Sequence, residues 1–423
     1  MGNGTSRITA PGFRWRTSAQ AGVSRKPVRL GIDVPLLLAV TTLLVFGLLM
    51  VYSASSDYSL MVLGKTPTFM FSRQLIFAGL GIGLAAFLAM FNYHRYQKFA
   101  LALMAFTVGL LIIVLVVNEV INNASRTLLG GSVQPSELAK IAIVIYLSVW
   151  LYAKRDQLSE VGFGLFPLGV ILGTLGGLII LQPDISATAT IFILGGLMFF
   201  LAGGDLRQIA LLILIGLVAG WLVYQLSPTG NQRVSEYSLS FEALTRAPMH
   251  LSRSLEALVK GGWFGVGIGR ADTKLTGLPV PPTDSIFAVV GEETGFAGAI
   301  TLVTLYILIL WRGLRIAQRA PDGLGKLLAA GLSLWIVIEA LINMAVIVGL
   351  VPFAGNALPF ISAGGSSLVV SLAAVGILLN ISRLSNQSRE EEERTFDAVV
   401  NLRWRDRGRR VSRPRRSESA NRR

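Results

Sequence analysis

The sequence predicts an all-α integral membrane protein with ten transmembrane helices and a long extracytoplasmic loop between the seventh and the eighth. Hydrophobic residues make up 52% of the 423 residues and charged residues only 15%, against about 25% charged in a typical soluble domain. The apolar residues form long continuous runs, which indicates spanning helices rather than the alternating strands of a barrel. Cysteine is absent and histidine occurs only at His94 and His250, which excludes thiol chemistry and histidine-rich metal sites.

Ten segments come close to the roughly 20 apolar residues that a helix needs to cross a bilayer. They are residues 34–53, 70–91, 99–117, 138–153, 162–181, 184–203, 207–226, 284–311, 327–350 and 365–382. Together they predict a membrane domain over residues 34–382. The long loop, residues 227–283, contains an amphipathic stretch at 249–259 that could lie on the membrane surface.

The orientation follows from lysine and arginine in the short loops, because these residues favour the cytoplasmic side. Two of these residues, Lys65 and Arg126, lie in the short odd-numbered connections. Nine lie in the even-numbered connections: Arg95, Lys98, Lys154, Arg155, Arg207, Arg312, Arg315, Arg319 and Lys326. This asymmetry places both termini in the cytoplasm, and the basic tail of residues 1–33 agrees with it.

Residues 383–423 form a highly charged tail, with an acidic run at 390–393 and many arginines from Arg403 onward. Such a composition predicts disorder. We interpret the tail as a device for topology and solubility that attracts anionic lipid, in preference to a docking segment for a cytoplasmic partner. The net charge of +14 is therefore mainly an orientation signal, and we expect no nucleic-acid partner.

The fourth span opens with Gln-Pro-Ser-Glu-Leu-Ala-Lys at residues 134–140. Pro135 suits the first turn of a helix, and Ser136 can cap it. Glu137 and Lys140 are three residues apart and share one helix face. A simple ion pair would explain why both charges are tolerated. It would not explain why they occur in an apolar helix, where charges are costly and usually functional.

Further charges lie near the outer ends of the spans. Asp184 starts the sixth span, where the helix dipole alone could account for it. Arg73 is either a residue whose charged end reaches the membrane interface or an anion ligand. Thr283 is a candidate N-cap for the eighth span, which places Asp284 in the first helical turn. The helix dipole would also stabilise an acid at Asp284. Alternatively, the proline-rich segment 278–283 could hold the Asp284 carboxylate in a fixed place as a catalytic base.

Glu292 and Glu293 lie deeper in the eighth span, roughly 12–14 Å along the helix from Asp284. We expect at least one of them to face the bundle interior or a water-filled cavity. The glycine-rich segment 261–269, with Gly262 and Gly265, is predicted to be a flexible loop pressed against lipid or other backbone, not a nucleotide-binding loop. A second such segment enters the tenth span.

That second segment, residues 358–368, ends in Gly364, Gly365, Ser366 and Ser367. Its glycines permit a tight re-entry, and its serines can cap a helix or bind an anion. Taken alone, the residues predict an outward-facing cavity with acids at Glu137, Asp184 and Asp284 and cations at Lys140, Arg73 and Arg126. Such a cavity suits general-base chemistry on a phosphorylated or lipid-linked substrate, or an ion-coupled transporter.

These motifs together resemble the SEDS family of peptidoglycan glycosyltransferases, which includes FtsW, RodA and SpoVE. The resemblance covers residues 33–383. Its motifs are Val-Tyr-Ser-Ala-Ser at 51–55, residues 134–140, Gln-Pro-Asp at 182–184, residues 261–269, residues 283–293 and residues 358–368. The charged extensions and Ser285 lean toward the FtsW type. Six motifs in the family's order, with ten spans and a long fourth outer loop, are highly specific.

The resemblance implies polymerisation of lipid II into glycan strands at the outer face of the bacterial cytoplasmic membrane, in cell division or cell-shape maintenance. Undecaprenyl pyrophosphate would be released, and Asp284 would deprotonate the acceptor hydroxyl. Arg126, Glu137 and Lys140 match positions that shape the donor cavity. Implied partners are a class B penicillin-binding protein and other divisome or elongasome membrane proteins. A divalent cation, magnesium or manganese, is compatible with this chemistry, but the sequence specifies no ligands for one.

Five positions depart from the family pattern. Val280 and Pro282 replace a usual Glu and His, Thr127 replaces a Trp, Ala363 replaces a Tyr, and His250 replaces a Gln. Asp284 and the Glu137–Lys140 pair are retained, so we expect an active enzyme. Two alternatives stay open: a lipid II flippase, which would need polar residues along its whole depth, and a non-catalytic scaffold of the divisome.

Overall fold

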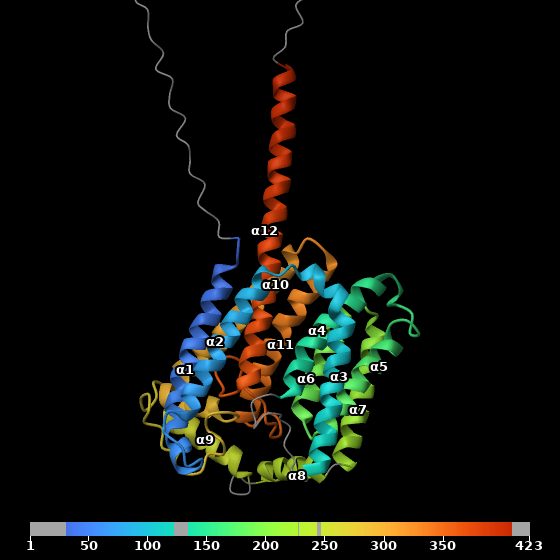
Figure 1. Cartoon of the computed structure of the whole chain (residues 1–423). Helices are drawn as coiled ribbons and strands as arrows, with labels where there is room; N and C mark the ends of the chain where they lie inside the picture. Colours follow the sequence, from blue (N-terminus) through green and yellow to red (C-terminus); the bar gives the residue numbers. More distant parts are fainter. Residues whose placement is uncertain (1–30, 122–133, 227, 243–246, 408–423) are drawn as a thin grey trace, which may run out of the picture. The chain divides into compact units, whose positions relative to one another are not determined.

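The computed structural model describes residues 31–121, 134–226, 228–242 and 247–407, and in these residues all regular secondary structure is helical. Figure 1 shows the helices in chain order. They are α1 (Val34–Met61), α2 (Phe69–Met90), η1 (Tyr93–Arg95), α3 (Tyr96–Ile121), α4 (Pro135–Lys154), η2 (Arg155–Gln157), α5 (Leu165–Ile180), α6 (Ile185–Leu201), α7 (Leu206–Leu226), α8 (Pro228–Glu242), α9 (Met249–Gly261), α10 (Ile286–Arg319), α11 (Gly323–Ile347) and α12 (Gly365–Arg407).

The ten predicted apolar segments coincide with ten of these helices. Seven are long and apolar enough to cross a membrane, namely α1, α2, α3, α4, α10, α11 and α12. The other three, α5, α6 and α7, are apolar but have shorter apolar stretches. An all-helical membrane protein is therefore supported, and the count of ten spans stays a prediction.

Burial separates central helices from peripheral ones. The most apolar windows of α11 and α12 are 72% and 78% buried, whereas that of α2 is only 17% buried. The exposed side chains of α2 are nevertheless large and apolar, including Ile76, Leu80 and Phe87. An exposed apolar surface of this kind is expected where a helix faces lipid, so α2 combines a lipid face with a narrow face toward the bundle.

That narrow face of α2 packs along α12 at close range. A Cβ atom added to Gly376 of α12 would lie 2.4 Å from the carbonyl oxygen of Ala85, and one added to Gly81 would lie 2.6 Å from Leu372. Helix association in membranes depends on close van der Waals packing, which small residues permit. The glycines therefore hold α12 in the centre of the bundle, with its N-terminus in a fixed place.

The long loop contains two helices, α8 and α9. Helix α9 confirms the amphipathic helix expected at 249–259. It packs against α10 and α11 and buries His250, Leu251, Ser254 and Ala257. The face expected to meet the membrane surface is thus used for packing within the protein, and α9 lies directly beside the start of α10.

The structure corrects the expectation of a disordered tail beginning at residue 383. Helix α12 continues without interruption to Arg407, as Figure 1 shows. The segment 383–407 contains neither glycine nor proline, and Gly408 follows its last helical residue. Charged residues with good helix propensity sustain the helix there. The rest of the tail, residues 408–423, and nearly all of the N-terminal tail, residues 1–30, lie outside the described residues.

Candidate active site

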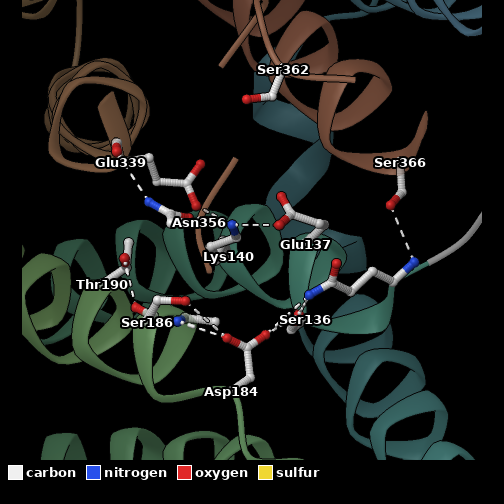
Figure 2. Close-up of polar contacts among 12 residues, drawn as sticks. Ser136, Glu137, Lys140, Asp184, Ser186, Thr190, Glu339, Asn356, Ser362 and Ser366 are labelled. Carbon is white, nitrogen blue, oxygen red and sulfur yellow. Dashed lines mark hydrogen bonds and ion pairs between the residues drawn. The ribbon is translucent and has the colours of Figure 1, made fainter. Parts of the chain in front are cut away.

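A polar cavity of about 220 Å³ lies where several segments distant in sequence meet. It is lined by Glu137, Lys140, Asp184, Asp284, Gly364, Gly365, Ser366 and Ser367, all of them predicted site residues, together with Gln134, Ser186, Ala187, Thr283, Gly355, Asn356, Ala357 and Ala363. Figure 2 shows much of this network. The structure thus brings eight predicted residues to one place, and their roles in chemistry stay predictions.

Four helices begin at the cavity: α4 at Pro135, α6 at Ile185, α10 at Ile286 and α12 at Gly365. The first turns of a helix have backbone N–H groups without intrahelical partners, and the helix dipole makes this end positive. Such ends are ready sites for anions. These helix starts add positive potential at the cavity wall, and at α6 the carboxylate of Asp184 already caps the helix.

Helix α4 begins with Pro135 in its first turn, as the sequence predicts, but Ser136 does not cap it. The N-cap is Gln134, which makes no side-chain cap bond, and the Ser136 hydroxyl donates instead to Asp184 Oδ2 at 2.9 Å. Proline needs no N–H partner at this position, so the helix starts without a serine cap. Ser136 is free to link α4 to α6.

The predicted Glu137–Lys140 contact is present, with 2.8 Å between Lys140 Nζ and Glu137 Oε1. Lys140 also bonds Glu339 of α11, 199 residues away in the chain. Lys140 is 1% exposed, and the three side chains form a buried group of net charge −1 (Figure 2). Glu137 Oε2 and Glu339 Oε2 have no hydrogen-bond partner among the described residues.

Asp184 is the N-cap of α6 and is 2% exposed. Its Oδ1 accepts from the Ser186 hydroxyl at 3.0 Å and from Ala187 N at 3.2 Å. Its Oδ2 accepts from Ser136 and from Gln134 Nε2. Asp184 therefore both caps α6, as the helix dipole favours, and lines the cavity. Its two carboxylate oxygens accept hydrogen bonds from four donors.

Asp284 lies in the turn just before α10, because the helix begins at Ile286 with Ser285 as its N-cap. The expectation that Thr283 caps the helix and that Asp284 lies in its first turn is wrong by two residues. The Thr283 hydroxyl instead contacts the Val280 carbonyl at 3.4 Å. The half-buried Asp284 carboxylate lies beside Gly355, where a Cβ atom would be 2.9 Å from Oδ2.

The backbone around Asp284 is fixed from two sides. Asn343 of α11 donates to the Asp284 carbonyl at 3.0 Å. The segment before α12 supplies the Ser362 hydroxyl, which donates to the Thr283 carbonyl at 2.7 Å, and Ala363 N, which donates to the Pro282 carbonyl at 2.8 Å. A base must be held in place to act in catalysis, and these bonds hold the turn that carries Asp284.

The segment before α12 also forms the far wall of the cavity. Ser366 accepts a hydrogen bond from Gln134 N at 3.1 Å, linking the starts of α12 and α4. A Cβ atom on Gly365 would lie 2.7 Å from the ring of Phe77. Glycine is therefore required at position 365, where α12 meets α2, and a tight re-entry at Gly364 and Gly365 stays a prediction.

Six predicted residues, Arg73, Pro135, Gly262, Gly265, Glu292 and Glu293, are not among those that line this cavity, and Arg126, together with Thr127, lies outside the described residues. Arg73 is half-buried on α2, with its guanidinium 5.9 Å from the centroid of the Phe77 ring. Glu292 and Glu293 are fully buried but belong to a second cluster with Gly262 and Gly265. The two glutamates thus face the interior as predicted, but they do not line the cavity.

The second cluster is a contact between the glycine-rich loop and a kink in α10. Gly295 interrupts the helix with φ +68° and ψ −169°. Its neighbours pair with the loop: Val266 N donates to Glu292 O at 3.0 Å, and Phe296 N donates to Gly262 O at 2.9 Å. A Cβ atom on Gly265 would lie 2.2 Å from Glu293 O. The loop is therefore pressed against backbone, one of the two predicted options.

The two glutamates fasten this loop. Glu292 accepts from Asp272 N at 2.9 Å and from the Thr273 hydroxyl. Glu293 accepts from the Ser53 hydroxyl of α1 at 2.6 Å and pairs with Lys274 Nζ at 3.2 Å. Buried carboxylates persist when they are paired in this way. Their position explains them as structural groups that join α1, the loop and α10.

Substitution of Gly295 by alanine is expected to lower the free energy of unfolding by about 2–4 kcal/mol, because a side chain at this φ and ψ is strained and would be overpacked. The added Cβ atom would lie 2.4 Å from Gly265 N. Gly216→Ala is the matched control, since Gly216 in α7 has open space around it. Thermal unfolding in detergent measures both, and equal midpoints for the two variants would contradict a tight contact at the kink.

His250, one of the departures from the family pattern, lies next to the candidate base. Its Nε2 is 2.9 Å from the hydroxyl of Ser285, and its ring centroid is 4.2 Å from that of Phe353. Burial lowers the pKa of His250 to about 4. The residue is therefore a neutral hydrogen-bonding group at ordinary pH, and it positions the residue that follows Asp284.

The lowered pKa predicts a loss of stability in acid. Between pH 6.5 and pH 4 the unfolded chain takes up a proton at His250 that the folded protein does not, which costs about 3 kcal/mol by pH 4. Unfolding midpoints recorded against pH should fall less steeply in His250→Gln than in the wild type. His94→Gln, which leaves His250 in place, should keep the steep fall. Parallel curves for wild type and His250→Gln would contradict the prediction.

Three residues important to the site were not predicted from sequence: Asn343, Asn356 and Gln134. Asn343 donates to the Asn356 carbonyl at 2.6 Å, and Asn356 donates to the Glu339 carbonyl at 3.1 Å. Glu339 is an isolated acid within the apolar segment 327–350. Buried amides in apolar helices are a usable signal, because such groups require partners.

The acidic residues present do not define a metal site. Within the described ranges, no group of three or more His, Asp or Glu side chains could hold a metal ion. The carboxylate of Asp184 is held by serine, amide and backbone donors, and that of Glu137 is bonded to Lys140.

The fold and the cavity define a multi-pass membrane protein whose charged groups gather where four helices begin. The chain belongs to the FtsW/RodA/SpoVE family, whose model, described as a cell cycle protein, matches residues 34–387. The probable peptidoglycan glycosyltransferase FtsW of Trichlorobacter lovleyi is 38% identical over 368 residues, covering 85% of this chain and 96% of that protein. Stage V sporulation protein E of Bacillus subtilis is 37% identical over 362 residues, covering 84% and 97%.

Solved structures share the fold. The crystal structure of Thermus thermophilus RodA, a rod shape determining protein, aligns with a TM-score of 0.60 at 25% identity, covering 84% of this chain and 98% of that one. A chain from a peptidoglycan synthase complex, described as coordinating polymerisation and crosslinking, aligns with a TM-score of 0.66 at 24% identity, covering 84% and 99%. These likenesses confirm the fold, and the family model and the curated relatives confirm the family that the sequence resembles.

Proposed function

We propose that this protein is a peptidoglycan glycosyltransferase that polymerises lipid II at the outer face of the bacterial cytoplasmic membrane. One observation carries the proposal: a half-buried carboxylate, Asp284, lines the same cavity as the N-termini of four helices and the ammonium of Lys140. A base and an anion-binding environment in one cavity are what glycosyl transfer from a pyrophosphate requires. The names of the curated relatives support the same activity.

The role of Asp284 is general-base catalysis. A sugar hydroxyl is a poor nucleophile at neutral pH, and a positioned carboxylate can take its proton as the new bond forms. In the proposed step, the 4-hydroxyl of the acceptor GlcNAc gives its proton to Asp284. Its oxygen then bonds to the anomeric carbon of the donor, and the bond from that carbon to the pyrophosphate oxygen breaks.

The departing pyrophosphate takes the bonding electrons, so negative charge grows on it in the transition state. The helix N-termini at the cavity supply positive potential that can stabilise this charge without reorganisation, whereas Lys140 is already paired with Glu137 and Glu339. Glu137 and Glu339 hold the ammonium of Lys140 in position. The Asp184 carboxylate is held by its four donors, and we assign it to positioning the α6 N-terminus rather than to proton transfer.

The proposed orientation follows from the loop charges. With both termini in the cytoplasm, the starts of α4, α6, α10 and α12 face outward, where lipid-linked substrate would be presented. A class B penicillin-binding protein is the proposed partner, because the glycan product must be crosslinked. The solved peptidoglycan synthase complex, whose description couples polymerisation to crosslinking, supports a partnership of that kind.

The test is an assay of the full-length protein in proteoliposomes supplied with labelled lipid II, with and without a class B penicillin-binding protein. Two readouts are taken: glycan chain length on gels, and the rate at which lipid II crosses the membrane. Glycan polymer without accelerated crossing is the expected result.

The other outcomes would overturn the proposal in different directions. Accelerated crossing without polymer would identify a lipid II flippase. If the protein binds its partner and unfolds cooperatively but gives neither polymer nor accelerated crossing, it would be identified as a scaffold.

A further inference from the structure

A second cavity, of about 200 Å³, lies at the opposite end of α10 from Asp284. Its walls come from the start of α1, the last turns of α10 and the part of α12 around residues 382–386. Arg312, Arg315 and Arg319 line it, spaced to share one face of α10. Along the helix this cavity is roughly 40 Å from the active-site cavity, so the two are separate sites.

The charge in this cavity is not balanced. Asp33 is the one acid among the lining residues, and it forms two bonds with Arg312, at 3.0 and 2.5 Å. Arg315 and Arg319 remain as a positive excess, both exposed. Arg389 of α12 acts on Arg319 as a further like charge. Like charges gathered at a hollow repel one another unless an anion lies between them.

The walls are fixed by neutral contacts. The Ser385 hydroxyl of α12 donates to the Arg319 carbonyl, and Asn386 donates to the Gly31 carbonyl at 3.1 Å. Asp33 also caps α1 through Leu36 N at 3.0 Å. These bonds tie three helices together around the cavity, which Arg315 and Arg319 also line. A pre-formed basic recess of this kind suits a phosphate group.

A tryptophan marks the level of this recess relative to the membrane. Trp311 is 53% exposed, and the guanidinium groups of Arg312 and Arg315 lie 5.3 and 5.1 Å from its ring centroid. Exposed tryptophan beside arginine is typical of the membrane–water interface. Basic pockets between spanning helices on the cytoplasmic side bind lipid headgroups. The phosphate therefore belongs at the depth of a lipid headgroup.

We infer that the recess formed by Asp33, Arg312, Arg315, Arg319 and the facing side of α12 binds the phosphate-bearing headgroup of an anionic lipid of the inner leaflet. The inference rests on the proposed orientation, with this end of α10 at the cytoplasmic side, and is independent of glycosyl transfer because it requires binding alone. Asp33 makes the recess selective by neutralising Arg312, and it leaves two guanidinium groups for one phosphate diester. Bidentate contact from arginine to phosphate is a strong form of charge-assisted hydrogen bond.

The test counts lipids bound to full-length protein by native mass spectrometry after exchange into phosphatidylglycerol or phosphatidylcholine. The double variant Arg315→Gln, Arg319→Gln is expected to bind phosphatidylglycerol roughly 30-fold more weakly than the wild type, since two charge-assisted contacts to the phosphate are lost. The matched control is Arg95→Gln, Arg155→Gln, two exposed arginines that also lie over aromatic rings. Its binding should equal that of the wild type.

Asp33→Asn should change lipid affinity in the opposite direction, because asparagine keeps the helix cap while removing the competing acid. It should bind phosphatidylglycerol more tightly than the wild type. Equal losses in the double variant and its control would overturn the inference, as would tighter binding of phosphatidylcholine. Displacement of phosphatidylglycerol by excess inorganic phosphate would reassign the recess to a soluble phosphate compound.

Discussion

Replacement of Asp284 by asparagine is expected to lower the rate of glycan polymerisation by about 10²- to 10⁴-fold, the usual contribution of a general base. Asparagine has nearly the same size and can keep every backbone bond of the turn, including the one from Asn343 to the residue 284 carbonyl. It cannot accept a proton from the acceptor hydroxyl. Initial rates with labelled lipid II measure the loss, and binding of lipid II should change much less than turnover.

Asp156→Asn is the matched control for this substitution. Asp156 lies in η2, and its side chain is 88% exposed, so polymerisation should stay at the wild-type rate. Both variants should unfold at the wild-type temperature. A near-normal rate for Asp284→Asn would show that another group removes the proton, and it would return the cavity to the alternative of substrate transport.

Replacement of Lys140 by methionine is expected to lower the free energy of unfolding by about 3–5 kcal/mol, the cost of leaving buried charges without their partner. Methionine resembles the lysine stem in shape, so packing beside Trp335 is largely kept. The carboxylates of Glu137 and Glu339 would face each other with no ammonium between them. Unfolding of the purified protein in detergent measures the change.

The neighbouring glutamate permits a double-mutant cycle. Glu339→Gln leaves Lys140 paired with Glu137 at 2.8 Å and should cost far less than Lys140→Met. The double variant should be more stable than the sum of the two single changes predicts. Lys154→Met, at the exposed end of the same helix, should change stability by less than about 0.5 kcal/mol. Additive effects at 140 and 339 would contradict a coupled buried group.

The positions of the apolar helices could be predicted from sequence because the signal for each span is local: about 20 apolar residues between polar ends. The kink at Gly295 could not, since a helix-period pattern continues through it and only the contact with Gly265 requires it. The extension of α12 to Arg407 was missed for a different reason. The high charge of residues 383–407 predicts disorder, whereas the absence of glycine and proline from the same segment supports a helix.

In the site, sequence reasoning found the acids and Lys140 because ionisable residues in apolar segments are conspicuous. It could not pair Lys140 with Glu339 or place Asp284 beside Gly355, because these residues meet only through the packing of distant helices. The cap assignments failed at Ser136 and Thr283. Both residues have the right chemistry for a cap, but their hydroxyls have other partners: Ser136 bonds to Asp184, and Thr283 bonds to the carbonyl of Val280 in the preceding turn.

The convergence of four helix starts on one cavity has a consequence for inhibition. Every residue except proline carries a main-chain N–H group. A side-chain change, such as Ala363 in place of the tyrosine of the family pattern, therefore leaves these groups in position. A compound that mimics pyrophosphate and binds these groups would meet the same donors in side-chain variants of the cavity wall. Resistance would then require movement of a helix start or a proline at a donor position, and either change would also damage catalysis.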